Sequence, residues 1–189
     1  MNHALVYSYA LLFGLMVLEG IGFPVPSEVI MPYVGYFSRL GSMDLAGGIT
    51  VGTLGSLVGS IIDYYVALKL GLPFLKKYGR AIRFNERRLA LLNKWFDKHG
   101  AYAVFGFRFV PEIRALISLP AGLARMNLVK FVVFTALGHL IWDSLLATLG
   151  YIYYAQVGYV SKLLETYSAY LFVLGVVVVV VLLVYNLRK

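Results

Sequence analysis

The feature that most constrains this chain is a charged, proline-broken stretch inside apolar sequence. It runs from Gly106 to Arg125 (GFRFVPEIRALISLPAGLAR) and carries Arg108, Glu112 and Arg114 around Pro111. A charge within a membrane segment costs roughly 2.5 to 3.5 kcal/mol on insertion scales. Such a cost indicates that these charges serve a site.

A second stretch repeats this pattern with the opposite charge. It runs from Leu18 to Pro32 (LEGIGFPVPSEVIMP), where Glu19 and Glu28 bracket Pro24 and Pro26. Two oppositely charged breaks in apolar sequence predict that their side chains meet.

Composition indicates the class of protein. The chain has 189 residues, of which 60% are hydrophobic and 14% charged, and its mean hydropathy is +0.79. A soluble domain of this size cannot bury so much apolar surface. We therefore expect an all-α integral membrane protein with a single polytopic domain over residues 1–189. The chain has no cysteine, which excludes disulfides and thiolate sites.

Basic residues gather in the middle of the chain, between Lys76 and Lys98, and two more close it at Arg188 and Lys189. By the positive-inside rule, this loop (76–98) and the C-terminus are expected on the cytoplasmic side of the plasma membrane. The same cluster suits contact with anionic lipid headgroups. It lacks the soluble, base-reading face of a nucleic-acid site, so no nucleic-acid partner is expected.

The first part of the chain, about 4–71, reads as a broken hairpin followed by a span. The apolar run from Ala4 to Leu18 has 15 residues, or roughly 22 Å of helix, which is less than a bilayer core of about 30 Å. A second short run, Val29 to Leu40, follows the prolines, so a re-entrant hairpin is expected. Leu45 to Gly71 is a full span that contains Asp63, and its small residues fall four apart on one face: Gly48, Gly52, Ser56 and Ser60.

A basic connector, 72–100, follows. Within it, Asn85 to Lys98 has the pattern of an amphipathic interfacial helix with Asn85 as its N-cap.

The second part, about 101–150, repeats the plan of the first. A broken hairpin to Leu123 precedes a span from Leu128 to Gly150, which carries His139 and Asp143. A tyrosine-rich loop, 151–167, and a plain C-terminal span, 168–187, complete the prediction.

The two parts are predicted to be inverted copies. IIDYYVALKLG, which ends at Gly71, matches LIWDSLLATLG, which ends at Gly150. The charge rule makes the first hairpin open to the outside and the second to the inside. Inverted repeats with broken helices that meet at mid-membrane are the architecture of secondary transporters.

These motifs resemble a known family. LEGIGFPVPSE before a glycine-rich span, then FRFVPEIRALISLPAGLARM with Phe131 and Trp142 downstream, are similar to the DedA family, also called the SNARE-associated or VTT-domain family. The likeness runs from about Leu18 to Gly150. Many members have P-G-E or P-G-D where this chain has a serine, Ser27, and this departure concerns the turn and not the acid.

The resemblance implies a polytopic lipid transporter. Bacterial members are linked to the recycling of undecaprenyl phosphate across the plasma membrane, others to phospholipid translocation, and eukaryotic relatives to scrambling. The family's membrane-embedded acids correspond to Glu19 and Glu28, and its two arginines to Arg108 and Arg114.

The residue types suit that chemistry. Guanidinium groups pair with phosphate in bidentate geometry, so Arg108 and Arg114 are expected to bind the substrate phosphate. The alternative is that they form buried ion pairs with Glu112 or with Glu19 and Glu28. Burial raises and a nearby arginine lowers a carboxyl pKa, so these two acids are candidates for proton coupling.

Asp63, Glu112, His139 and Asp143 are secondary candidates. The two aspartates are expected mainly to hydrogen-bond or pair within the bundle, and His139 to pack or hydrogen-bond there. Their spacing predicts no metal site, and no cofactor is expected.

Three functions are open at this point. The first is a lipid-phosphate flippase that is not an enzyme, with lipid phosphate and membrane lipids as its partners. A phospholipid scramblase or flippase is a variant of it. The second is a phosphatase on lipid phosphates, and the third is an antiporter of a small solute or ion with protons. A homo-oligomer is compatible with all three.

Overall fold

The computed structural model describes residues 3–23, 25–78, 86–110, 113–159, 161–163, 166–167 and 170. Within these residues the chain is helical and contains no strand. The helices are α1 (His3–Gly20), α2 (Ser27–Arg39), α3 (Leu45–Tyr78), α4 (Glu86–Phe107), α5 (Ile113–Leu116), α6 (Ser118–Leu123), α7 (Leu128–Ile152) and the 3-10 helix η1 (Tyr154–Gln156).

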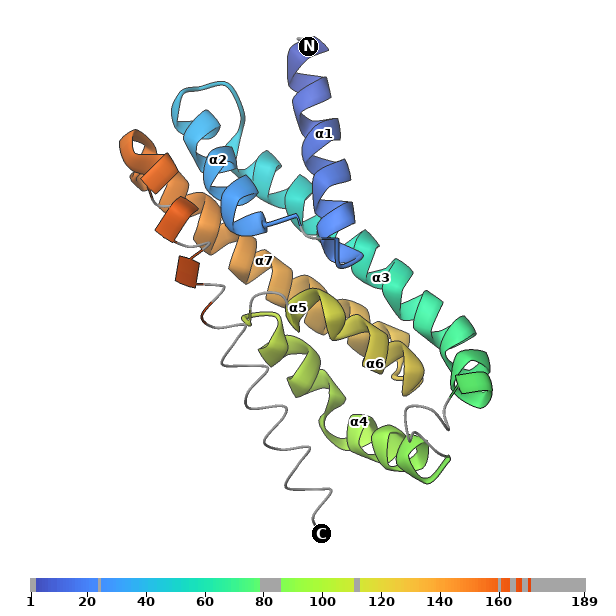
Figure 1. The fold of residues 1–189 in the computed structure, drawn as a ribbon. Helices are drawn as coiled ribbons and strands as arrows, with labels where there is room; N and C mark the ends of the chain where they lie inside the picture. Colours follow the sequence, from blue (N-terminus) through green and yellow to red (C-terminus); the bar gives the residue numbers. More distant parts are fainter. Residues whose placement is uncertain are drawn as a thin grey trace.

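Two of the described helices are long and apolar enough to cross a membrane. The apolar part of α3, Leu45–Gly71, has 27 residues, and α7, Leu128–Ile152, has 25. At about 1.5 Å per residue, each exceeds a bilayer core of about 30 Å. The two helices are in contact and run in opposite directions across the molecule (Figure 1). The Asn127 side chain caps the start of α7 by accepting a hydrogen bond from the backbone N–H of Lys130 at 3.1 Å.

The remaining helices form two broken hairpins. Helix α1 ends at a turn in which Gly22 has a φ of +82°, a backbone conformation that glycine adopts without strain. Helix α2 then starts at Ser27 behind the extended Pro26. In the second hairpin α4 ends at Phe107, and the return arm consists of α5 and α6 with a turn at Ile117 between them.

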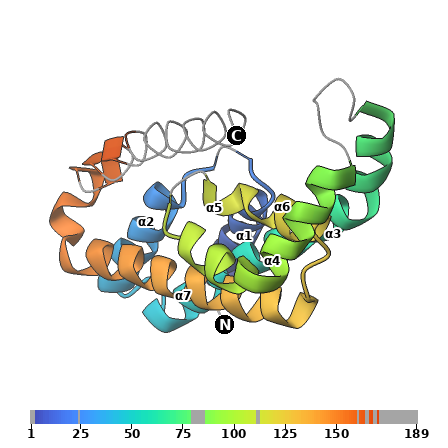
Figure 2. The same ribbon diagram turned by 90° about the horizontal axis from the view of Figure 1, so that it is seen from below.

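The hairpins approach the long pair from opposite ends (Figure 1). Helix α1 packs on α3 while α2 packs on α7, and α4 packs on α7 while α6 packs on α3. Each hairpin therefore straddles both long helices. Viewed from below, the α1–α2 turn and α5 meet near the centre of the molecule (Figure 2).

Glycines allow these helices to touch backbone to backbone. A Cβ atom on Gly20 of α1 would lie 2.5 Å from the Ser56 carbonyl oxygen and 3.0 Å from the Gly59 Cα atom of α3. A Cβ atom on Gly35 of α2 would overlap the carbonyl oxygen of Ala147 in α7. The predicted small-residue face of α3 is therefore a contact face, as small-residue patterns in membrane helices usually are.

Buried side chains form a core at each end of the long pair. One cluster joins α1, α2, α3 and α7 around Met16 and Met31. The other joins α3, α4, α6 and α7 around Val104 and Phe131, where Tyr64 stacks on the Phe131 ring at 4.8 Å. The polar side chains described below lie between these two cores.

The structure differs from the sequence-based expectation in two places. The amphipathic segment after Asn85 does not end near residue 100 but continues as α4 to Phe107, because the apolar residues after Gly100 extend the same helix. The expected loop 151–167 is largely helical where it is described. Pro111, Glu112, the connector residues 79–85 and most of the expected C-terminal span 168–187 lie outside the described residues.

The α2–α7 contact predicts opposite effects for two matched substitutions. Gly35→Ala is expected to destabilise the protein by about 1–3 kcal/mol or more, since the added methyl group overlaps backbone atoms of α7. Gly14→Ala on α1 is expected to be neutral or stabilising by up to about 1 kcal/mol, because its Cβ meets no atom within 4 Å. Thermal unfolding in detergent, followed by tryptophan fluorescence, measures both; equal midpoints would contradict this packing.

Candidate functional site

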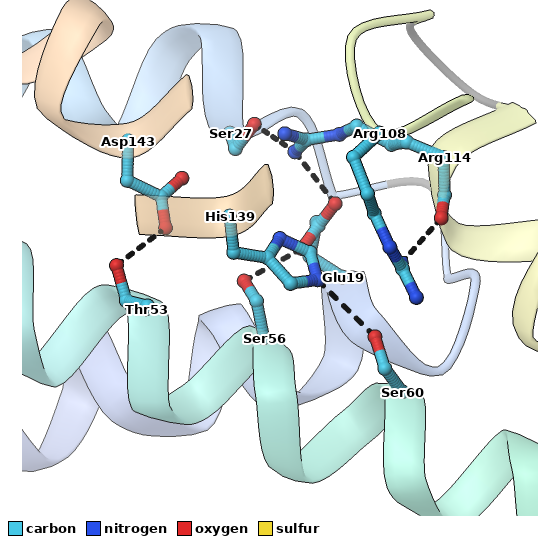
Figure 3. A network of polar contacts seen from close by, with 9 residues as sticks. All are labelled: Glu19, Ser27, Thr53, Ser56, Ser60, Arg108, Arg114, His139 and Asp143. Carbon is cyan, nitrogen blue, oxygen red and sulfur yellow. Dashed lines mark hydrogen bonds and ion pairs between the residues drawn. The ribbon is translucent and has the colours of Figure 1, made fainter. Parts of the chain in front are cut away.

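Polar side chains that are separated by up to 124 residues in sequence meet between the two cores. The network joins the ends of α1 and α4, the starts of α2 and α5, and the middles of α3 and α7 (Figure 3). Its drawn members are Glu19, Ser27, Thr53, Ser56, Ser60, Arg108, Arg114, His139 and Asp143. All nine are buried.

The two long helices supply the polar walls of this site through helical periodicity. On α7, Thr135, His139 and Asp143 recur every fourth residue and share one face. On α3, Ser56 and Ser60 are likewise four apart. Ser56 donates a hydrogen bond to Glu19, and Ser60 lies within hydrogen-bond distance of His139 (Figure 3).

Arg114 joins the two hairpins. Its Nη2 atom lies 2.6 Å from Glu19 Oε1 and also donates to Ser27 Oγ. Its guanidinium carbon lies 5.7 Å from the centroid of the Trp142 ring. Arg114 and Glu19 thus form a buried arginine–glutamate ion pair of the kind that the sequence analysis gave as the alternative.

Arg108 has a different set of partners. Its side chain is 0% exposed, and it donates from Nη1 to the Arg114 carbonyl oxygen. Its Nη2 atom donates to Ser118 Oγ at 2.9 Å and to Thr135 Oγ1 at 3.2 Å. Among the described residues no carboxylate lies within ion-pair distance of it. Arg108 is thus a buried cation whose described partners are all neutral.

The two expected glutamates are both buried but are bound differently. Glu19 accepts a hydrogen bond from Ser56 Oγ at 2.9 Å in addition to its ion pair. Glu28 lies in the first turn of α2, where the helix dipole favours a negative charge. Its Oε1 atom has no hydrogen-bond partner in the described part of the chain.

The secondary candidates lie along the contact between α3 and α7. His139 Nε2 is 3.2 Å from Ser60 Oγ, and Asp143 Oδ2 accepts from Thr53 Oγ1 at 3.1 Å. Asp63 is buried on α3. Glu112 lies outside the described residues. Over the described residues, no group of three or more acids and histidines is arranged to hold a metal ion.

Several buried donors in this region are left without a partner. They are Arg108 Nε, Arg114 Nη1 and the indole Trp142 Nε1, none of which has a hydrogen-bond acceptor within the described part of the chain. An unpaired buried donor costs about 1–3 kcal/mol, and more when it is charged. Such donors, two of them on cations, can bind an anionic acceptor.

The sequence analysis did not assign the neutral residues of this site to it. Ser27, Ser118 and Thr135 bind the two arginines, and Trp142 lies beside Arg114. Thr135 could have been identified from its spacing, because it precedes His139 by one helical turn. Ser27 and Ser118 gave no periodic signal, since they lie at or next to helix breaks.

Comparison with known proteins identifies the family. The VTT-domain family model matches residues 25–152. The chain belongs to the VTT-domain family. The resemblance to DedA proteins noted from the sequence motifs is therefore confirmed.

Members of this family that resemble the chain over most of its length have informative names. Undecaprenyl phosphate transporter A of Bacillus subtilis is 36% identical over 87% of this chain and 83% of the relative. The protein of the same name in Staphylococcus aureus is 33% identical over 92% of this chain and 88% of the relative. An alkaline phosphatase-like protein of Lactococcus lactis is 34% identical over 93% of this chain and 85% of the relative. No solved structure gives a significant match.

The unequal pairing of the two glutamates predicts unequal effects on stability. Glu19→Gln is expected to cost about 3 kcal/mol, because it leaves the Arg114 charge buried without its carboxylate. Glu28→Gln is expected to cost at most about 1 kcal/mol, the value of a favourable charge at a helix start. Thermal unfolding midpoints in detergent test this order, and a larger loss for Glu28→Gln would refute the observed pairing.

Proposed function

We propose that this protein translocates a lipid phosphate across the cell membrane, with undecaprenyl phosphate as the substrate. The observation that carries the proposal is Arg108, a fully buried guanidinium with only neutral partners among the described residues. The names of the relatives from Bacillus subtilis and Staphylococcus aureus support the choice of substrate.

A lipid phosphate matches what the site lacks. Burying a charge without a paired counterion is costly, and among the described residues no carboxylate pairs with Arg108, so binding of an anion beside it is expected to be favourable. Arg108 Nε, Arg114 Nη1 and Trp142 Nε1 are donors without a partner in the described chain, and phosphate oxygens are strong acceptors for such groups. We assign Arg108 and Arg114 to the phosphate and Trp142 to a supporting donor.

An inverted repeat would allow one site to open to either leaflet of the membrane. Gly59 and Gly138, Ser60 and His139, and Gly71 and Gly150 are each 79 positions apart (138 − 59, 139 − 60 and 150 − 71). The hydrogen bond between Ser60 and His139 thus joins equivalent positions, as expected where a two-fold axis passes.

The same 79-residue register relates the two hydroxyls that bind charged groups at the centre of the site. It pairs Ser56 with Thr135, and these hydroxyls bind Glu19 of the first hairpin and Arg108 of the second. The exchanged packing of α1, α2, α4 and α6 on the long pair follows the same symmetry. We infer two hairpins that open to opposite faces, with the basic loop 76–98 and the C-terminus cytoplasmic.

Proton coupling completes the proposed cycle. The Arg114 guanidinium that binds Glu19 is also a donor for phosphate, so the carboxylate and the substrate compete for it. Protonation of Glu19 and Glu28 would release the arginine to the lipid, and departure of the lipid would favour loss of the protons.

The arginines give the first test. Arg108→Gln and Arg114→Gln are each expected to lower the rate of undecaprenyl phosphate movement in proteoliposomes by about 10- to 100-fold, the loss of a hydrogen bond to a charged group. Arg108→Lys keeps the charge without the planar fork and is expected to lie between Arg108→Gln and the wild type. Arg39→Gln, at the exposed end of α2, is the matched control and is expected to transport normally. Wild-type rates in both site variants would exclude the proposed role.

The acids give the second test. We expect wild-type transport to rise as pH falls, because protonated carboxyls no longer hold the arginine. In the double variant Glu19→Gln, Glu28→Gln this pH dependence is expected to disappear. Transport rates are measured at several pH values with equal pH on both sides of the vesicle membrane. A double variant that keeps both the rate and the pH dependence would eliminate the coupling step.

A phosphatase is the second candidate, and one observation favours it. Ser60 Oγ and His139 Nε2 are 3.2 Å apart, a distance suitable for a nucleophile and its base, and the Lactococcus relative is named alkaline phosphatase-like. However, His139 Nδ1 has no orienting partner in the described chain. The proposed two-fold symmetry also explains the contact between Ser60 and His139 without a catalytic role. Release of inorganic phosphate from the lipid, abolished by Ser60→Ala, would replace the transport proposal.

A further inference from the structure

We propose that a cleft between α1 and α2 holds the hydrocarbon chain of the polyprenyl phosphate while its headgroup occupies the arginine site. This inference rests on the proposed lipid-phosphate substrate and adds a second binding site for a different part of the same molecule. A headgroup site alone leaves the long apolar chain without a defined place.

The cleft is a distinct apolar cavity. Its volume is about 550 Å³, within the range of small-molecule sites. Its lining is mostly aliphatic and aromatic, and comes from α1, α2 and the start of the α2–α3 connection: Ser8, Leu11, Leu12, Leu15, Val29, Ile30, Tyr33, Val34, Phe37, Ser42 and Met43.

The packing of the hairpin explains why this space exists. Helix α1 makes its main contacts with α3, and α2 makes its main contacts with α7, so the two arms of the hairpin touch each other little. The arms diverge away from their turn (Figure 1). Leu11 and Phe37 at the edge of the cleft are 65% and 45% exposed, which leaves it open to the membrane.

The cleft lies close to the arginine site along both arms of the hairpin. Leu15 lies four residues before Glu19 and therefore one turn along the same face of α1. Ile30 lies three residues after Ser27, in the first turn of α2. Glu19 and Ser27 are both partners of Arg114. The inner end of the cleft thus lies about one helical turn from two partners of Arg114, the group proposed to bind phosphate.

The position of the cleft between two helix arms indicates the class of lipid. Two helix arms enclose one slot, which suits the single chain of a polyprenyl phosphate. A phospholipid carries two acyl chains behind its phosphate and would leave one of them outside. We therefore commit to a single isoprenoid chain as the occupant.

Photolabelling tests the occupant. A polyprenyl phosphate with a diazirine in its first isoprene units is incorporated into proteoliposomes with the full-length protein, and the adducts are located by mass spectrometry. We expect adducts on Leu15, Ile30 and their neighbours, suppressed by excess unlabelled polyprenyl phosphate but not by the corresponding polyprenol or by phosphatidic acid. Equal labelling of the lipid-facing Leu54 on α3, or equal competition by either other lipid, would overturn the proposal.

Filling the cleft tests its role in transport. Leu15→Trp and Ile30→Trp are each expected to slow polyprenyl phosphate movement about tenfold, the effect of roughly two buried methylene groups losing contact. Binding of the short, soluble dimethylallyl phosphate is expected to stay at the wild-type level, which also shows that the variants are folded. The matched control is Leu54→Trp, at a 48% exposed position outside the cleft, and it is expected to transport normally.

The outcomes separate this inference from the proposed function. Wild-type transport with no specific adducts in the cleft, or with tryptophan variants as active as Leu54→Trp, would refute the cleft while leaving the transporter intact. Specific adducts in the cleft without movement between leaflets would uphold the chain site and refute transport.

Discussion

The structure depends on one electrostatic constraint: an arginine and a glutamate from the two helix breaks are buried together away from water. Arg114 and Glu19 are 95 positions apart (114 − 19) and meet at 2.6 Å. Either charge alone would be costly in an apolar interior. The pair therefore requires both hairpins to reach the same depth, and this requirement determines how the short helices sit on the long ones.

Glycines allow the hairpins to approach the long helices closely enough to reach that depth. Gly20 ends α1 directly against α3, one residue after Glu19, and no larger residue fits there without moving backbone atoms. The carboxylate is thereby brought to Ser56 on the same helix. Close helix packing and the polar network are thus two aspects of a single contact, in which small residues bring the backbones together and the hydroxyls beside them satisfy the charges.

Arg108 differs from Arg114 in its described partners. Arg114 has its carboxylate, whereas Arg108 is surrounded by a carbonyl oxygen and two hydroxyls in the described structure. These neutral acceptors bind both Nη atoms of Arg108 without cancelling its charge. Proteins retain such costs mainly at functional sites. The difference between the two arginines is what turns a structural ion pair into a candidate binding site for a lipid phosphate.

Local sequence information by itself determined the helical class, the two long spans and the two charged breaks, because composition and chain length relative to the bilayer depend on neighbouring residues alone. The same information pointed to Glu19, Glu28, Arg108 and Arg114 as one site, since four expensive charges in apolar sequence need one another. It did not reveal where α4 would end, because an amphipathic pattern and an apolar pattern can share one continuous helix.

Only the tertiary structure decided which of the described charges pair. Glu19 rather than Glu28 forms the ion pair with Arg114, and among the described residues the side chains that accept hydrogen bonds from Arg108 are Ser118 and Thr135 rather than an acid. These choices depend on the rotation and depth of each hairpin against α3 and α7, which result from backbone contacts between residues far apart in the chain. No periodicity within a single segment encodes such contacts.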